Sequence, residues 1–233
     1  MNIKALEYIK FLEFCFINKV NSPSQLSQDL VALYFSKIKK DGIFIEIGAC
    51  DGVQFSNTFK LEQYGWNGII CEPSPYWLKK MRSRNCIISK KAVFHESGLK
   101  LKFEDVEKYP DLSGLSTNFE KDANSNLRQN TKTTEVETIT LNDLIEKNMP
   151  NKKIDYISID TEGSEYEIIK NFNFDKFKVE IFTIEHNFID KKRDDILKLM
   201  TSNGYIRILQ NLSKWDDWYI KKDNKVLLSM MNK

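Results

Sequence analysis

The stretch Ile43-Phe44-Ile45-Glu46-Ile47-Gly48-Ala49-Cys50-Asp51-Gly52 decides the fold of this chain. It begins as a short apolar run rich in β-branched residues, which predicts a buried strand, and it ends in a turn with two glycines. Helix-compatible sequence follows at 55–64, and a second apolar run, 68–71, ends on Glu72. Strand, tight turn, helix, strand and acid is the order of a nucleotide-binding βαβ unit. Glu72 is then expected at the carboxyl end of the second strand, where an acid can accept hydrogen bonds from both hydroxyls of a ribose.

The glycine turn indicates which nucleotide this unit binds. Three residues separate Gly48 from Gly52, so the turn lacks the G-x-G-x-x-G spacing of a dinucleotide fingerprint. Because neither glycine has a Cβ, the backbone there can turn sharply and approach a ligand. Glu46 and Asp51 add carboxylates that would repel a pyrophosphate and attract a sulfonium or an amino group. The pattern favours S-adenosylmethionine (SAM) over NAD; an ordinary turn of another α/β protein is the alternative.

Composition sets broad limits on the class of protein. The chain has 233 residues, the size of one α/β domain with small additions. Its formal net charge of +2 gives no overall argument for binding to nucleic acid or a membrane. The four cysteines match no zinc or Cys-x-x-Cys spacing, which suits a reducing compartment. No apolar run approaches the roughly 18 residues of a membrane span, and the N-terminus does not resemble a signal peptide. We expect a cytoplasmic protein without a membrane span.

The hydrophobic pattern divides the chain into an N-terminal helical extension, 1–40, and a main domain, 41–233. The extension is expected to form two helices, over 3–17 and from 23 or 24 to about 39; the first could instead be a membrane-surface or dimer helix, so a homodimer stays open. In the main domain the alternation of strands and helices predicts an α/β, Rossmann-like, mostly parallel seven-stranded sheet with helices on both faces. The expected strands are 43–47, 68–72, 86–88, 133–139, 154–160 and 179–185, and the expected helices are 55–64, 76–84, 141–147, 164–171 and 191–202.

Three segments depart from this alternation. Residues 91–103 are predicted to add a β-hairpin to the sheet, with its turn at Ser97-Gly98. The polar stretch 104–132 is predicted to be a long loop with partial helix over 118–128, serving either as a lid or as a surface insertion. Two strands near 205–210 and 216–221 are expected to end the sheet as an antiparallel pair.

Polar residues gather at the predicted carboxyl ends of strands, where a parallel sheet binds its ligand. Asp160-Thr161-Glu162-Gly163-Ser164 directly follows one apolar strand, and Glu185-His186 ends the next. Carboxylates and an imidazole there could act as a general base, as metal ligands, or as both. Each could also be an ordinary loop charge, and a lone histidine is often structural. The candidate catalytic residues are therefore Asp160, Glu162, Glu185 and His186.

The same four side chains leave the question of a metal open. Mg²⁺ or Mn²⁺ could be held mainly by Asp160 and Glu185, because both ions accept oxygen ligands. An imidazole paired with a carboxylate can equally act as a base near neutral pH. Since no repeated ligand spacing is present, the sequence favours base catalysis without a metal.

Two blocks of this sequence resemble the FkbM-type SAM-dependent methyltransferases. The first contains Glu46-Ile47-Gly48-Ala49-Cys50-Asp51-Gly52 and Cys71-Glu72-Pro73-Ser74-Pro75. The second, which is the more specific, is Ile159-Asp160-Thr161-Glu162-Gly163-Ser164-Glu165-Tyr166-Glu167. The similarity covers roughly residues 41–210. It implies a class I methyltransferase fold and O-methylation, often of sugars or other hydroxylated metabolites.

The resemblance also implies roles for individual residues. The methionine part of SAM would be surrounded by Glu46, Gly48, Ala49, Asp51 and Gly52, and Glu72 would hold the ribose. Pro73 and the region of Lys91 and Ala92 would border the adenine, and the cofactor carboxylate or the substrate could contact Ser56 and Asn57. The acceptor pocket would be lined by Ser113, Gly114 and Leu115. Cys50 stands where the family commonly has an asparagine, so the side-chain contacts of that turn are less well implied.

We therefore expect a SAM-dependent O-methyltransferase that acts on a hydroxyl of a sugar, a glycan or a glycosylated metabolite. The rivals are a nucleic-acid or protein N-methyltransferase and a non-catalytic SAM-binding module. The turn at 160–163 is acidic and poorly suited to a phosphate backbone, so no nucleic-acid partner is expected. The best argument for nucleic acid is the basic group Lys79, Lys80, Arg82, Arg84, Lys90 and Lys91.

Overall fold

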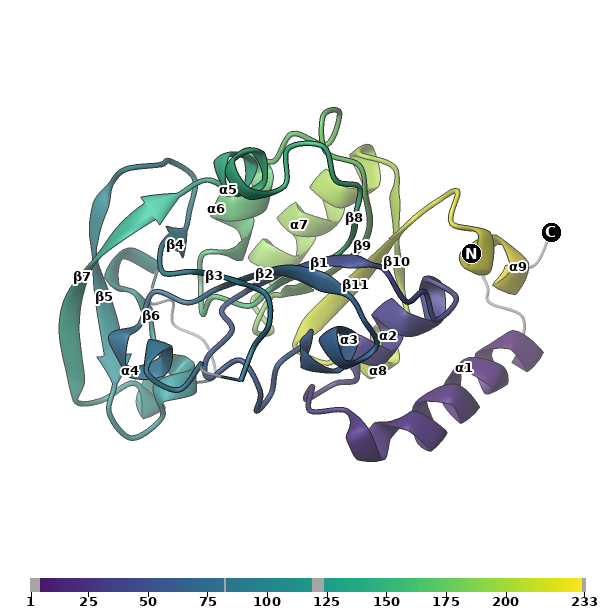
Figure 1. The fold of residues 1–233 in the computed structure, drawn as a ribbon, viewed down its shortest axis with the longest axis horizontal. Coiled ribbons are helices and arrows are strands. Elements are labelled where there is room, and N and C mark those ends of the chain that lie inside the picture. The colour runs from purple at the N-terminus through teal and green to yellow at the C-terminus, as the bar shows by residue number, and fades with distance from the viewer. Residues whose placement is uncertain (1–4, 82, 119–123, 232–233) are drawn as a thin grey trace.

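The computed structural model describes residues 5–81, 83–118 and 124–231 (Figure 1). Some predictions concern residues outside these ranges: the first two residues of the predicted N-terminal helix, Arg82 of the basic group, and 119–123 of the predicted partial helix.

A seven-stranded sheet forms the centre of the molecule, in the order β10-β11-β9-β8-β1-β2-β3. Neighbouring strands are parallel except that β11 runs antiparallel to both β9 and β10. The predicted terminal antiparallel pair is thus present, and the sheet is mixed, with β11 as its reversed strand. The strands are β1 (Ile43–Ile47), β2 (Asn67–Cys71), β3 (Ile87–Ser89), β8 (Ile154–Ile159), β9 (Val179–Glu185), β10 (Tyr205–Ile208) and β11 (Asp216–Lys221).

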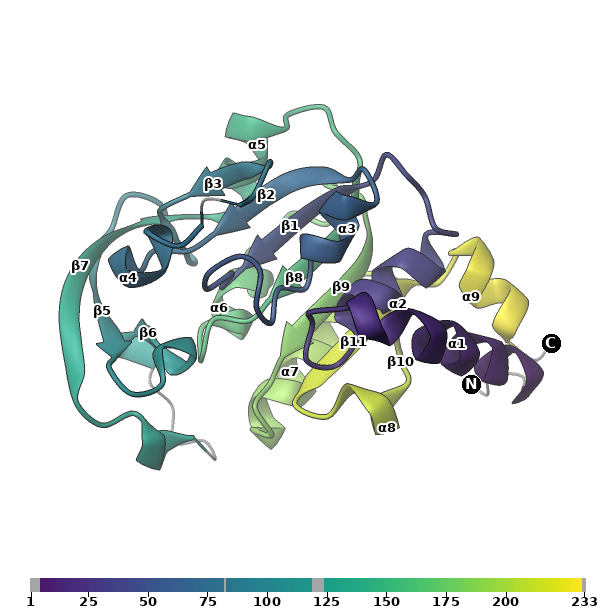
Figure 2. The ribbon, with the colours of Figure 1, turned by 60° about the horizontal axis from the view of Figure 1, so that its bottom comes forward.

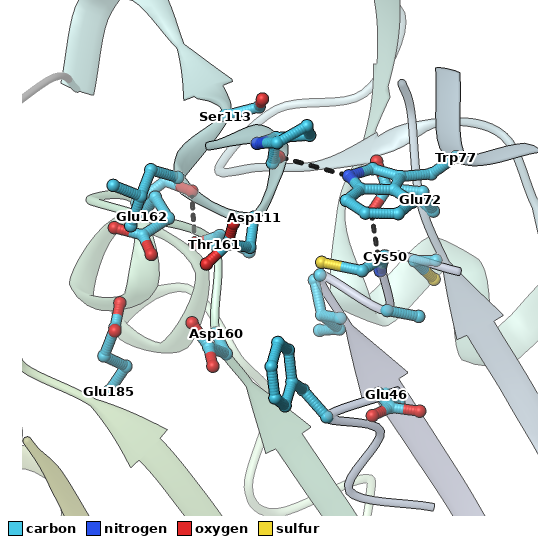
Figure 3. A pocket seen from close by; sticks show the side chains of 18 of the residues that line it. Glu46, Cys50, Glu72, Trp77, Asp111, Ser113, Asp160, Thr161, Glu162 and Glu185 are labelled. Atoms are coloured by element: carbon cyan, nitrogen blue, oxygen red, sulfur yellow. Dashed lines mark hydrogen bonds between the residues drawn. The ribbon is translucent and has the colours of Figure 1, made fainter. Parts of the chain in front are cut away.

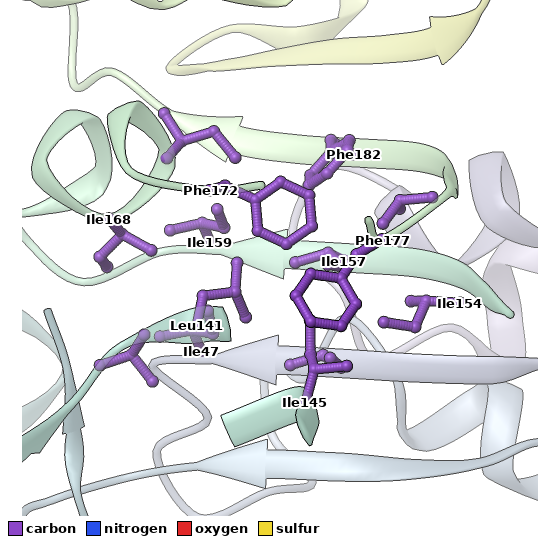
Figure 4. Packing of buried hydrophobic residues seen from close by; sticks show 14 of the residues in the cluster. Ile47, Leu141, Ile145, Ile154, Ile157, Ile159, Ile168, Phe172, Phe177 and Phe182 are labelled. Atoms are coloured by element: carbon purple, nitrogen blue, oxygen red, sulfur yellow. The ribbon is translucent and has the colours of Figure 1, made fainter. Parts of the chain in front are cut away.

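Helices cover both faces of this sheet (Figures 1 and 2). Successive side chains of a strand point to opposite faces, so Phe44 packs in one hydrophobic cluster and Ile45 in the other. Figure 4 shows part of the cluster that contains Ile145, Phe172 and Phe182. One face carries α5 (Leu141–Asn148), α6 (Glu165–Lys170) and α7 (Asp190–Ser202); the other carries α1 (Ala5–Asn18), α2 (Gln28–Phe35), α3 (Phe59–Gln63) and α9 (Lys225–Met230). Single turns of helix, α4 (Pro75–Leu78) and α8 (Gln210–Ser213), follow β2 and β10.

The N-terminal extension packs on the sheet through α1 and α2. Phe11 and Leu30 are buried in the same hydrophobic cluster as Phe44. The outer face of α1 leaves Phe16 85% exposed. A role for this face against a second copy or a membrane surface stays a prediction. No helix within the described ranges combines the length and apolar character needed to cross a membrane.

Helix α2 is shorter than the sequence predicts, because the residues before it make other contacts. Ser24 forms an isolated β-bridge with Phe55, and its hydroxyl donates to Asp29 Oδ1 at 2.6 Å. Ser27 has φ of +68°, so the helix begins only at Gln28. Positive φ angles at 37 and 38 end it early. The bridge between Ser24 and Phe55 connects the extension to the main domain.

A second, four-stranded sheet takes the place of the predicted hairpin, and the predicted pairing of its first two strands is wrong. Its order is β4-β7-β5-β6, so β7 separates β4 from β5. The chain crosses the end of β7 on leaving β4, where the amide of Gly98 donates to the carbonyl of Thr138 at 3.0 Å. β5 then pairs antiparallel with β7 over its whole length. The strands are β4 (Ala92–Val93), β5 (Lys100–Val106), β6 (Gly114–Leu115) and β7 (Thr131–Ile139).

Candidate functional site

A cavity of about 380 Å³ lies at the carboxyl ends of β1, β2, β8 and β9. This size is typical of pockets for small ligands. Figure 3 shows the cavity with Glu72 and Trp77 on one side and Asp160, Glu162 and Glu185 on the other. The second sheet and the described part of the 104–132 loop contribute a further wall, through residues that include Phe103, Tyr109, Asp111, Ser113, Leu115 and Leu127.

Glu72 holds the turns after β1 and β2 together. Its Oε2 accepts the amide N–H of Cys50 at 3.0 Å, and its Oε1 accepts the amide N–H of Ser74 at 2.9 Å. Burial raises the pKa of Glu72 to about 8, while the two backbone hydrogen bonds oppose that rise. A carboxylate can accept about four hydrogen bonds, two on each oxygen. Each oxygen of Glu72 can therefore accept one further hydrogen bond from a ligand.

Glu46 has a different environment, in which donors surround its carboxylate. Oε2 accepts the hydroxyls of Ser56 at 2.8 Å and Thr58 at 2.6 Å, and Oε1 accepts the amide N–H of Asn57 at 2.5 Å. The buried guanidinium of Arg84 lies 3.5 Å from Oε2. Glu46 therefore anchors the segment before α3, which explains why that helix begins at Phe59 and not near residue 55.

Gly48 is required by the neighbouring strand end. Its φ is +85°, and a Cβ there would lie 1.6 Å from the carbonyl oxygen of Asp160. The amide of Asp160 donates to the carbonyl of Ile47 at 3.0 Å, so the ends of β1 and β8 are held side by side. The sequence predicted that Gly48 lets the backbone approach a ligand; the structure shows that it lets β1 approach β8.

The carboxyl groups of Asp160, Glu162 and Glu185 converge on one point of the cavity wall. Each offers an oxygen, and these oxygens all lie within 4.8 Å of one another. Glu185 is only 4% exposed, and its Oε2 has no hydrogen-bond partner among the described residues. Burial, with the charge of Asp160, raises the pKa of Glu185 well above its ordinary value. Burial, with the charges of Asp216 and Glu165, does the same to the pKa of Asp160.

Glu162 differs from the other two acids because it forms an ion pair with Arg128. Its Oε2 accepts from Arg128 Nη2 at 2.5 Å and from Asn187 Nδ2 at 3.1 Å. Burial and the charge of Asp160 raise the pKa of Glu162 to about 8, against the opposing effect of Arg128. Its φ is +56°, an uncommon backbone conformation for a residue with a side chain.

A buried ion pair shapes the turn that carries Asp160 and Glu162. Glu165 Oε1 accepts the amide N–H groups of Thr161 and Gly163 at 2.9 and 3.0 Å. Its Oε2 accepts from Lys192 Nζ at 2.8 Å, and both side chains are buried. Glu165 thus fixes the path of the backbone through the positive-φ residue between those two amides.

Comparison with known proteins identifies the family. The sequence profile of the methyltransferase FkbM domain matches residues 46–207, which is more than half of the chain. The protein belongs to the FkbM methyltransferase family. This membership supports a methyltransferase function and the use of SAM, and the α/β sheet described above agrees with the predicted fold class. A comparison with curated proteins gave no significant match.

Solved structures similar to this FkbM-family chain include three methyltransferases. A methyltransferase FkbM from Methylobacillus flagellatus KT has 12% sequence identity and a TM-score of 0.49, over 78% of this chain and 44% of its own. This chain therefore spans less than half the length of that protein. A precorrin-6y C5,15-methyltransferase from Geobacter metallireducens GS-15 has 13% identity and a TM-score of 0.42, over 83% and 88% of the two chains. TrmK of M. capricolum, in complex with S-adenosylhomocysteine, has 17% identity and a TM-score of 0.37, over 83% and 68%.

The residues of the cavity fit the SAM that the FkbM family implies. Asn57 Oδ1 is a buried acceptor without a hydrogen-bond partner among the described residues, and it suits an ammonium donor. Glu72 has free acceptor capacity for the ribose hydroxyls, and Ala92 with Pro73 offers an apolar border for the adenine. When bound, SAM would supply an electrophilic methyl group. Glu46, Gly48, Ala49 and Ser56 also line the cavity, and their predicted cofactor roles stay predictions.

Several residues predicted to form the site do not line the cavity. Asp51 Oδ1 accepts the amides of Val53 and Gln54, each at 2.8 Å, so its carboxylate shapes the surface turn. Gly52 donates to the carbonyl of Ala49, and Gly114 lies in β6 without reaching the cavity, unlike its neighbours Ser113 and Leu115.

His186, another predicted catalytic residue, also does not line the cavity. Its Nδ1 accepts the amide N–H of Phe188 at 3.0 Å, so Nε2 carries the proton and donates to the carbonyl of Asp216 at 3.1 Å. Burial lowers its pKa below the ordinary value, which favours this neutral form. His186 follows the last residue of β9, and both of its ring nitrogens are engaged by these two backbone groups.

Sequence reasoning missed other residues of the wall. Trp77 lies directly after the β2 turn, and its Nε1 donates to the carbonyl of Pro110 at 3.1 Å. Gln25 reaches the cavity from the N-terminal extension. The position of Trp77 shortly after Glu72 was a usable signal. Gln25 gave none, because it lies outside the block of family resemblance.

The basic group that argued for nucleic acid does not form one exposed patch. Arg84 is buried and pairs with Glu62 at 3.0 Å as well as with Glu46. Lys91 pairs with Glu137 at 2.5 Å, and Lys80 lies over the ring of Tyr76. These partners account for three of the described cations.

Proposed function

We propose that this FkbM-family methyltransferase transfers the methyl group of SAM to a hydroxyl of a sugar, a glycan or a glycosylated metabolite. The observation that carries the proposal is the acidity of the cavity. Its described lining contains six carboxyl side chains and a single ammonium group, that of Lys91. The carboxyl side chains are Glu46, Glu72, Asp111, Asp160, Glu162 and Glu185.

This charge distribution favours a neutral, hydroxyl-rich acceptor. A nucleic acid or another polyanion would bring phosphates against like charges, whereas proteins that bind phosphate backbones neutralise them with Lys and Arg. Hydroxyl groups donate hydrogen bonds to carboxylates, so a sugar finds acceptors over the same surface. A SAM-binding module without catalysis would not need acids at the position of the acceptor.

The carboxyl pair of Asp160 and Glu185 provides for the acceptor proton. As the acceptor oxygen forms its bond to the methyl carbon and the sulfur–methyl bond breaks, the hydroxyl proton must leave. A carboxylate of the pair can receive it. Burial and the neighbouring charges raise the pKa of both groups well above their ordinary values, which makes the carboxylate of each a stronger base than an ordinary one.

Aromatic side chains near the cavity suit the apolar face of a sugar ring. Phe55 is 43% exposed and Phe188 is 59% exposed, and both line the cavity. Each has a positive φ, +63° and +58°, a conformation that costs energy and occurs most often at functional positions. The C–H groups of a pyranose can pack on such rings while its hydroxyls face the acids.

The experiment is methyl transfer from labelled SAM to a panel of acceptors. The panel contains neutral mono- and oligosaccharides, glycosylated metabolites, nucleotide-linked sugars, RNA, DNA and protein, and the product linkage is determined by NMR. We expect a methyl ether on a neutral acceptor, and product formation by Asp160→Asn that is slower by roughly 10²–10⁴-fold. Methylation of an amine or of nucleic acid alone would replace this proposal by the N-methyltransferase. Tight SAM binding without transfer to any acceptor would favour the binding module.

A further inference from the structure

We propose that Asp160, Glu162 and Glu185 form a binding site for one divalent cation, Mg²⁺ or Mn²⁺, at the acceptor side of the cavity. The site is defined by the protein alone; the role we give to the cation rests on the proposed function. Two observations carry it: the convergence of three carboxylates, and a buried oxygen of one of them, Glu185, that has no hydrogen-bond partner among the described residues.

The geometry is close to that of a coordination shell. The three carboxylate oxygens lie within 4.8 Å of one another, and Figure 3 shows the groups gathered at one side of the cavity. Oxygen ligands lie at about 2.0–2.1 Å from Mg²⁺, so neighbouring ligands of an octahedron are about 2.9 Å apart and opposite ligands about 4.2 Å apart. A shift of about 1 Å by each side chain would therefore close the shell around an ion.

The unpartnered oxygen belongs to Glu185. This side chain is more than nine-tenths buried, and its Oε2 accepts no hydrogen bond from the described residues. Buried carboxylate oxygens without partners are rare, because desolvation of the charge is not offset. The groups facing Glu185 are acids, Asp160 first among them, so the protein supplies negative charge where it would need a donor.

The net charge of the cluster matches a divalent ion. Arg128 and Asn187 both bind Glu162 Oε2, and Arg128 offsets one of the three negative charges. When all three carboxyl groups are ionised, two negative charges therefore remain for an ion to balance. An all-oxygen ligand set suits Mg²⁺ and Mn²⁺ better than softer metals. The main rival is a single proton shared by Asp160 and Glu185, as occurs in other close carboxyl pairs.

A cation there would address the weak acidity of a sugar hydroxyl. Three protein oxygens leave coordination positions open toward the cavity, and Mg²⁺ commonly keeps such positions for water or substrate. An acceptor oxygen bound to the cation loses its proton more readily, because the metal stabilises the developing negative charge. Asp160 and Glu185 would then orient the acceptor through the ion as well as receive its proton.

The direct test is Mn²⁺ binding to the metal-stripped protein, followed by electron paramagnetic resonance and by calorimetry with Mg²⁺. We expect one Mn²⁺ per chain and at least tenfold weaker binding in Glu185→Gln and in Asp160→Asn. Glu135→Gln is the matched control, since this glutamate is exposed on β7, and it should bind Mn²⁺ as the wild type does. Circular dichroism tests whether each variant is folded. If Glu185→Gln or Asp160→Asn does not fold, Glu162→Gln is used in its place.

Absence of Mn²⁺ binding at millimolar concentration, or equal binding by Glu185→Gln and wild type, would overturn the cation site. The shared-proton rival gives the first of these results. Methyl transfer separates this inference from the proposed function. If methyl transfer to a hydroxyl continues in excess EDTA, the catalytic role of the cation is wrong and the O-methyltransferase proposal stands. If the three acids bind Mn²⁺ but the protein methylates no hydroxyl, the cation site stands and the proposed function is wrong.

Discussion

Glu46 and Glu185 are both buried glutamates at the carboxyl ends of strands in the same sheet, beside the cavity. They differ in the hydrogen-bond donors that surround each carboxylate. Glu46 accepts hydrogen bonds from Ser56, Asn57 and Thr58 and lies beside the guanidinium of Arg84. Glu185 Oε2 has no donor among the described residues and faces other acids. The first carboxylate is already satisfied by the protein, whereas the second needs a proton, a cation or a substrate donor.

Glu72 is intermediate between the two. Each of its oxygens accepts one backbone N–H, which fixes the carboxylate and still leaves capacity for a ligand. The three glutamates show that burial at a strand end does not by itself mark a functional acid. We expect the number of donors that the protein supplies to each carboxylate to separate structural from ligand-binding roles, and the predictions below test that expectation.

The largest expected effect is a loss of turnover when Asp160, which lies beside Glu185 in the acid cluster, is replaced. Asp160→Asn removes a carboxylate from the place where the acceptor proton must leave, so we expect turnover to fall by roughly 10²–10⁴-fold. SAM affinity should change little, because Asp160 lies across the cavity from Glu72. Steady-state kinetics and SAM titration of the same preparation test both statements; a variant with near-normal turnover would remove Asp160 from the chemistry.

The next effect is a loss in the free energy of unfolding when Glu46, whose carboxylate has several donors, is replaced. Glu46→Ala leaves the guanidinium of Arg84 buried with a partner lost, and breaking a buried pair in this way costs about 3–5 kcal/mol. Urea denaturation measures the loss in the free energy of unfolding. Glu135→Gln, on the protein surface, serves as the control and should change it by less than about 0.5 kcal/mol. A loss below about 1 kcal/mol for Glu46→Ala would show that its donors do not define a structural role.

Much of this contrast could not be read from the sequence. The strands at 43–47 and 154–159 were predictable because apolar runs and glycine turns are local signals. The same signals placed Glu46, Glu72, Asp160 and Glu185 at strand ends. Arg84 and Arg128 are distant in sequence from the acids they bind, so no local pattern reveals which carboxylates are neutralised.

Pairing between distant strands escaped prediction for the same reason. β7 enters between β4 and β5, although the sequence between β4 and β5 has the alternation and turn of a hairpin. His186 stands next to Glu185 in the sequence, but no local pattern reveals that its ring nitrogens bond the backbone groups of Phe188 and Asp216.

The intermediate glutamate predicts a pH dependence of SAM binding. The pKa of Glu72 is raised to about 8, so the group is largely protonated at pH 6 and ionised above pH 8. The ionised form accepts the ribose hydroxyls, hence SAM affinity should rise with pH by up to about tenfold per unit and level off above pH 8. Calorimetry in two buffers of different ionisation enthalpy should detect proton release at pH 7. A flat profile in the wild type would show that Glu72 is not the acid that responds.

The smallest effect is a gain in stability. The pKa of Glu185 is raised in the folded state, so the folded protein binds its proton more tightly and stability falls as pH rises above the ordinary value of 4.5. Glu185→Gln removes this penalty, and we expect the metal-free protein to gain about 0.5–2 kcal/mol at pH 8. The gain should be smaller at pH 5, where the Glu185 carboxyl of the folded wild type is protonated and therefore uncharged, like the amide of the variant. Urea denaturation at both pH values measures the difference, and destabilisation at pH 8 would contradict the like-charge environment.

Calorimetric titration of SAM into wild type and Glu72→Ala tests most directly whether the strand-end cavity is a SAM site. Loss of a charged acceptor for the ribose hydroxyls should weaken binding by about 1–3 kcal/mol, or roughly 5- to 150-fold. The control Glu135→Gln should retain wild-type affinity, and saturating SAM should raise the melting temperature of the wild type. Equal affinity of Glu72→Ala and wild type for SAM, or a wild type stabilised by NAD and not by SAM, would contradict the account.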